Sequence, residues 1–197
     1  MERNISKEYL KAGIFEKWHK TSLAEYEGNE NLTTFIRDYL NNPIERGIFM
    51  TGINGTGKTM LMNIMFKKFI DSGESALIVP YWEVVKAYID SWSNKESVYN
   101  LMKKVKYLGI DDFGKSFEGT DNSKRMAKSA VEFLLTYRVQ RLKPTFFTSN
   151  IQYKDLREEY GDDIASKLNE ACVLVEIENK NKKKADYRYN LNEYYGF

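Results

Sequence analysis

The stretch Gly52-Ile53-Asn54-Gly55-Thr56-Gly57-Lys58-Thr59 decides the fold of this 197-residue chain. It lies between a short apolar run, residues 47–51, and a segment whose apolar residues recur at helical spacing. In a strand–loop–helix of this kind the glycines let the backbone curl, so that consecutive N–H groups point at phosphate oxygens. The start of the helix adds the positive end of its dipole. The sequence therefore predicts a phosphate-binding loop, or P-loop.

The P-loop pattern gives roles to single side chains. We expect Lys58 to reach the β- and γ-phosphates of ATP and Thr59 to offer its hydroxyl to Mg²⁺. The chain is therefore predicted to bind ATP and Mg²⁺. The residues expected to contact the nucleotide are Gly52, Asn54, Gly55, Thr56, Gly57, Lys58, Thr59 and Met60.

Outward from the P-loop, apolar runs alternate with helical patterns. Strands are predicted at 47–51, 75–79, 107–112, 144–148 and 173–177. Helices are predicted at 31–41, from 58 past 69, at 82–89, 95–104 and 124–141, and as two short helices between 151 and 172. Strands that alternate with helices indicate an α/β fold with a mainly parallel sheet.

Three parts of the chain are expected: a short N-terminal arm and helix at 1–45, an ATPase core at 46–190, and a C-terminal tail at 191–197. Within the core, the polar residues 116–123 are predicted as a loop before the long helix. The predicted buried stripe of that helix consists of Met126, Ala130, Phe133, Leu134 and Tyr137.

Polar groups follow two further apolar strands. Asp111 and Asp112 end the run Tyr-Leu-Gly-Ile, and Thr148-Ser149-Asn150 ends the run Pro-Thr-Phe-Phe. Ligand chemistry in a parallel sheet gathers at the carboxyl ends of strands. We expect Asp111 to hold Mg²⁺, Asp112 to act as general base on the attacking water, and Asn150 to orient that water.

Composition excludes several classes of protein. A formal net charge of +2 is too small to indicate nucleic-acid binding by itself. The single cysteine, Cys172, can form neither an intrachain disulfide nor a zinc site. We expect Cys172 to be a core or interface residue and His19 to be a surface residue or one with its hydrogen bonds satisfied. No signal peptide and no membrane-length apolar run are visible, so a cytoplasmic location without membrane contact is expected.

Together these motifs resemble the AAA+ ATPases of the bacterial helicase-loader type, DnaC and DnaI, and their IstB-like relatives. The resemblance runs from Thr21 to Arg188. It rests on residues 52–59 as Walker A, residues 108–114 (Leu-Gly-Ile-Asp-Asp-Phe-Gly) as Walker B, residues 148–150 as sensor 1, and Asp186-Tyr187-Arg188 near the end.

The resemblance implies an AAA+ or RecA-like three-layer sandwich with a five-stranded sheet and no separate C-terminal lid domain. It implies an ATPase that loads a replicative helicase onto single-stranded DNA and self-associates through its ATP site. In that activity the implied catalytic residues are Lys58, Asp112 and Asn150, the Mg²⁺ residues are Thr59 and Asp111, and Arg188 contacts the nucleotide.

The chain departs from that group in two ways. Asp163 and Lys167 occupy positions where the group carries arginines that complete a neighbour's ATP site. Lysine lacks the planar fork of arginine, so weak hydrolysis without a partner is expected, while Arg138 and Arg157 remain open as substitutes. Little sequence precedes the core, which suits a bacteriophage or mobile-element protein.

Two other functions stay open on the sequence: an IstB-like transposition helper that binds duplex DNA, and a small-molecule kinase built on a P-loop scaffold. DNA contact depends on two basic clusters. These are Lys103, Lys104 and Lys106, and Lys180, Lys182, Lys183 and Lys184 followed by several tyrosines. Interleaved lysines and aromatic rings suit a single-strand groove, although a solvated surface explains the same pattern.

Overall fold

The structure, a computed structural model, describes residues 4–28, 30–93, 97–114 and 121–177. Its centre is a five-stranded sheet in the order β2-β3-β4-β1-β5, and every neighbouring pair is parallel. The strands are β1 (Gly47–Thr51), β2 (Ala76–Pro80), β3 (Tyr107–Phe113), β4 (Thr145–Ser149) and β5 (Cys172–Glu176). All five predicted strands are therefore confirmed, as is the α/β fold class.

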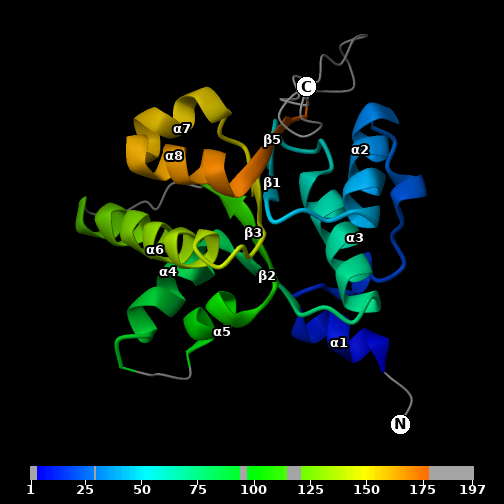
Figure 1. Ribbon diagram of the computed structural model, residues 1–197, viewed down its shortest axis with the longest axis horizontal. Helices are drawn as coiled ribbons and strands as arrows, with labels where there is room; N and C mark the ends of the chain where they lie inside the picture. The colour runs from blue at the N-terminus through cyan, green and yellow to red at the C-terminus, as the bar shows by residue number, and fades with distance from the viewer. Residues whose placement is uncertain (1–3, 29, 94–96, 115–120, 178–197) are drawn as a thin grey trace.

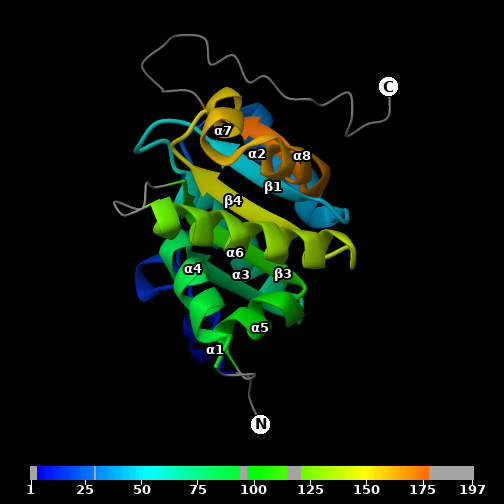
Figure 2. The same cartoon turned by 90° about the vertical axis from the view of Figure 1, so that its left-hand side faces the viewer.

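Helices cover both faces of the sheet and make three layers (Figures 1 and 2). One face carries α1 (Ile5–Lys11), α2 (Glu30–Asn41) and α3 (Lys58–Asp71). The other carries α4 (Tyr81–Asp90), α5 (Val98–Lys104), α6 (Asp121–Val139), α7 (Tyr153–Tyr160) and α8 (Asp162–Ala171). Because both faces are covered, β1 and β4 are buried at every position.

The N-terminal segment packs against the helix that follows the P-loop. Ala12 accepts a hydrogen bond from the Ile78 N–H at 2.8 Å, and the Tyr9 hydroxyl lies 2.5 Å from Asp71 Oδ1 at the end of α3. Two 3-10 turns, η1 (Glu16–Trp18) and η2 (Leu23–Glu25), carry the chain toward the P-loop. The described part of residues 1–45 is thus joined to the sheet by a shared apolar core.

The loop and buried stripe predicted around α6 are wrong in detail. The helix begins at Asp121, so Asp121, Asn122 and Ser123 are helical. Phe133 is 58% exposed. The buried face consists of Ala127, Ala130, Val131, Leu134, Leu135 and Arg138. Hydropathy alone favours Phe133, but the face of α6 that is buried beneath α8 and α4 is a different one, and the exposed Phe133 stacks on Tyr88.

Arg138 is fully buried near the end of α6, where it binds backbone carbonyl groups of the surrounding segments. Its guanidinium donates to the carbonyl oxygens of Met102 at 2.7 Å, Val105 at 3.0 Å, Lys106 at 2.8 Å and Pro144 at 2.8 Å. Its Nε donates to the Thr145 hydroxyl at 2.8 Å. Burial lowers the pKa of Arg138 to about 9, which still leaves the group charged at neutral pH.

Two single residues behave as expected. Cys172 is fully buried at the start of β5, and its thiol donates to the Thr145 carbonyl at 3.1 Å. His19 Nε2 lies 2.9 Å from the Ile14 carbonyl oxygen.

Within the described ranges, no helix combines the length and the apolar character that crossing a membrane would need.

Replacing Arg138 with Met is expected to lower the free energy of unfolding by about 3 kcal/mol or more, because buried carbonyl groups lose their donors. The matched control is Arg141→Met, since Arg141 is exposed and its guanidinium lies 3.8 Å from the centre of the Tyr137 ring. That control should cost no more than about 1 kcal/mol. Urea denaturation of both variants measures the difference, and equal losses would show that the Arg138 contacts contribute little.

Candidate nucleotide-binding site

The P-loop joins β1, near the middle of the sheet, to the start of α3. Gly55 and Gly57 have φ angles of +82° and +89°, which only glycine adopts without strain. Thr56 closes the loop on itself, because its hydroxyl donates to the Ile53 carbonyl at 3.0 Å. The turn therefore has the curled backbone that the glycine spacing predicts, and it lies at the carboxyl edge of a parallel sheet.

Lys58 is held inside this loop. Its side chain is buried, and Nζ donates to the carbonyl oxygens of Gly52 at 2.6 Å and Ile53 at 2.8 Å. Burial lowers the pKa of Lys58, while the nearby carboxylates of Asp112 and Asp111 act in the opposite direction. A cation held by carbonyl oxygens can exchange them for the oxygens of a bound phosphate.

Asp111 connects three elements through two hydroxyl groups. Its Oδ1 accepts from the hydroxyl of Thr59, on the first turn of α3, at 2.9 Å, and from the hydroxyl of Thr148 on β4. Thr59 and Asp111 were predicted as the Mg²⁺ residues, and the structure brings them together. Among the described residues, no group of three or more His, Cys, Asp or Glu side chains is arranged so that it could hold a metal ion.

Asp112 lies in an irregularity of β3. Ile110 pairs with Phe147 and Phe113 with Ser149, so β3 has one residue more than β4 over this stretch. Asp112 has a φ of +57°, and its N–H donates to the Thr148 hydroxyl at 2.9 Å. A bulge re-aims side chains next to it, and positive φ at a residue other than glycine is frequent at functional sites. The bulge keeps Asp112 at the same sheet edge as Asp111.

The three polar residues at the end of β4, Thr148, Ser149 and Asn150, have different environments. Ser149 is buried and structural, because its hydroxyl donates to the Phe113 carbonyl at 2.7 Å and accepts from the Ile151 N–H at 3.0 Å. Asn150 is exposed at the edge of the sheet. Thr148 is a site residue whose role sequence reasoning missed. The sequence signal that could have revealed it is the hydroxyl of Thr148 near the end of β4, the neighbour of the strand that carries Asp111 and Asp112.

Four residues were considered for the cation that would complete the ATP site of a neighbouring subunit, and the structure places them in different environments. Arg138 is excluded, because its guanidinium is fully buried and saturated with acceptors. Lys167 forms an ion pair with Glu132 at 3.2 Å, and Arg157 forms one with Asp162 at 2.9 Å, while Asp163 is exposed. Arg188, predicted to contact the nucleotide, lies outside the described residues, as does the second basic cluster.

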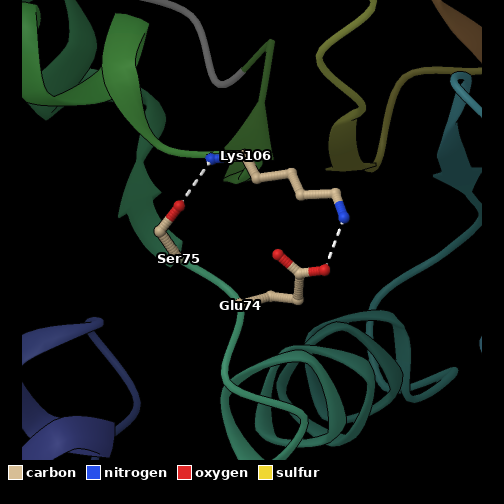
Figure 3. A network of polar contacts seen from close by, with 3 residues as sticks. All are labelled: Glu74, Ser75 and Lys106. Atoms are coloured by element: carbon tan, nitrogen blue, oxygen red, sulfur yellow. Dashed lines mark hydrogen bonds and ion pairs between the residues drawn. The ribbon is translucent and has the colours of Figure 1, made fainter.

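The first basic cluster is partly engaged in the fold. Lys106 joins the starts of β2 and β3, because its N–H donates to Ser75 Oγ at 3.0 Å and its Nζ to Glu74 Oε1 at 2.5 Å (Figure 3). Lys103 lies over the Tyr99 ring, with Nζ 4.8 Å from the ring centre. A structural role for Lys106 therefore explains part of the pattern that had suggested DNA contact.

Comparison with known proteins gives relatives in replication. The replicative helicase loader DnaI of Bacillus subtilis (strain 168) is 23% identical over 133 residues, which cover 66% of this chain and 42% of DnaI. The crystal structure of the DnaC helicase loader has a TM-score of 0.70 at 21% identity and covers 83% of this chain and 99% of that one. The chain resembles the DnaC/DnaI-like helicase loaders. No family model matches it.

A structure of the replication initiator DnaA bound to AMPPCP and single-stranded DNA is also similar, with a TM-score of 0.68 and 21% identity. It covers 83% of this chain and 51% of the DnaA chain. These likenesses show that the chain shares the fold of both proteins. The chain spans less than half the length of DnaI, so the activity of that whole protein does not follow from the likeness.

Lys58→Ala is expected to raise the dissociation constant for ATP by about 30-fold or more, because charge-assisted bonds to phosphate are lost. The control is Lys68→Ala, an exposed lysine on the same helix, which should leave the constant unchanged. Calorimetric titration with ATP and Mg²⁺ measures both. Equal affinity in wild type and Lys58→Ala would contradict the P-loop assignment.

Proposed function

We propose that this chain is an Mg²⁺-dependent ATPase that helps to load a replicative helicase onto single-stranded DNA. One observation supports the ATPase most directly: Lys58, the Thr59–Asp111 pair and the bulged Asp112 converge at one sheet edge. The replication role is supported by the similarity to a helicase loader in sequence and in fold.

In this proposal the loop amides and Lys58 hold the β- and γ-phosphates. Thr59 and Asp111 hold Mg²⁺, which neutralises phosphate charge when bound. Asp112 takes a proton from the water that attacks the γ-phosphorus, the bond to the β–γ bridging oxygen breaks, and ADP and phosphate leave. Asn150 orients the water from the end of β4. Thr148 keeps the Asp111 carboxylate and the Asp112 backbone in place, because its hydroxyl donates to Asp111 Oδ1 and accepts from the Asp112 N–H.

Asp112→Asn is expected to bind ATP with wild-type affinity but to hydrolyse it about 100-fold more slowly or worse, because an amide cannot accept the proton. Asparagine tolerates positive φ, so this variant keeps the bulge without added strain. Steady-state phosphate release measures turnover, with Asp155→Asn on α7 as the control. Wild-type turnover by Asp112→Asn would exclude Asp112 as the base.

The same variant tests the loader role. A chain that binds ATP without consuming it should retain the cognate replicative helicase on an affinity column in the presence of ATP, whereas Lys58→Ala should not. If all variants retained helicase equally, with and without ATP, helicase binding would not depend on the nucleotide site. Helicase that is never retained would contradict the loader role while leaving the ATPase intact.

We also propose that the site is completed by a second copy of the chain, and that the isolated chain is a weak ATPase. The second copy follows from the resemblance to the helicase loaders. The weak activity is supported by Lys167, because a lysine already paired with Glu132 presents a point charge that meets transition-state charge poorly. Turnover per chain should therefore rise with protein concentration. A rate independent of concentration in steady-state assays would show that one chain makes a complete site.

A further inference from the structure

A tyrosine from the N-terminal segment contacts the P-loop. The Tyr26 hydroxyl donates to the Thr56 carbonyl oxygen at 3.2 Å, across 30 residues of sequence. Its ring is buried, with 8% of the residue exposed. The ring also occupies the space beside Gly57, because a Cβ built there would lie 2.6 Å from Tyr26 Cε2. Gly57 is thus required both by its φ angle and by this ring.

The hydrogen bond fixes one peptide group of the loop. The Thr56 carbonyl and the Gly57 N–H belong to the same planar trans peptide, in which C=O and N–H point in opposite directions. A donor that holds the carbonyl on the Tyr26 side therefore directs the Gly57 N–H to the opposite side. Loop N–H groups are what a P-loop offers to phosphate, and a flipped peptide would offer a carbonyl oxygen instead.

The residues that lead to Tyr26 are anchored to the helix that starts at the P-loop. Lys67, on α3, is buried, and its Nζ donates to the carbonyl oxygens of His19 at 3.2 Å and of Thr21. Glu25 closes the short turn before Tyr26, because its Oε1 accepts from the Ser22 N–H at 3.0 Å. The segment from residue 19 to residue 26 is therefore held on α3 at one end and on the P-loop at the other.

We propose that Tyr26 is a positioning residue for nucleotide binding, which fixes the Thr56–Gly57 peptide so that its N–H faces the phosphates. The proposal rests on the proposed ATP binding and adds to it a residue from outside the nucleotide motifs. Its chemical target is the phosphate chain, not the base, because the peptide that Tyr26 holds belongs to the phosphate-binding turn.

The test compares Tyr26→Phe with Tyr39→Phe. Tyr39 is a matched control on the same face of the sheet, since its buried ring also carries a hydroxyl that donates to a backbone carbonyl, that of Arg46 at 2.6 Å. Each variant keeps its ring and loses the bonds of its hydroxyl, which for Tyr39 include a longer one to the Ile44 carbonyl at 3.4 Å, so urea denaturation should show small losses of stability in both. Only Tyr26→Phe should weaken ATP binding, by about three- to tenfold.

A second probe separates positioning from general loosening of the fold. Inorganic tripolyphosphate carries the phosphate chain without a base, so competition by it should weaken in Tyr26→Phe by the same factor as ATP binding. Unchanged ATP affinity in Tyr26→Phe, with binding lost in Lys58→Ala, would overturn the role of Tyr26 alone. An equal loss in Tyr39→Phe would also overturn it. No ATP binding by the wild-type chain would overturn the proposed function and this inference together.

Discussion

Asp111 accepts hydrogen bonds from Thr59 and Thr148, and this shared oxygen joins β3 to the first turn of α3 and to the end of β4. In the sheet, β4 lies between β3 and β1, the strand that leads into the P-loop and α3. The two hydroxyls therefore fix the P-loop helix and β4 relative to the acids of β3. A parallel sheet makes this possible, because it brings the carboxyl ends of all its strands to one edge.

Much of this edge could be predicted from the sequence, for a physical reason. Buried parallel strands are apolar runs, so the polar residues that end them, Asp111 and Asn150 among them, stand out. Side-chain bonds across strands leave no such trace, and the link from Thr148 to both acids was missed. The bulge at Asp112 was equally invisible, because one extra residue in a strand does not change its hydropathy. The predicted buried face of α6 was wrong for a related reason. Hydropathy places Arg138 at the surface and Phe133 in the core, whereas Arg138 is buried with many hydrogen-bond acceptors and Phe133 is exposed.

The N-terminal segment shows how a chain region without a motif can still belong to the site. Its sequence is polar with scattered aromatic residues, and it was expected to be an arm. In the structure, Lys67 and Tyr26 hold it between α3 and the phosphate-binding turn. Nucleotide binding and the packing of this segment therefore depend on the same helix. A partner that pulls on the segment would act on the loop without touching any Walker residue.

The single thiol of the chain has a use of a different kind. Cys172 lies fully buried at the start of β5, and burial raises the pKa of its thiol, so reaction with a soluble alkylating reagent requires the edge strand to open. Labelling kinetics at this one atom would follow opening of the sheet edge in the native ensemble, without any introduced probe. The protein thus carries its own reporter of how often β5 separates from β1.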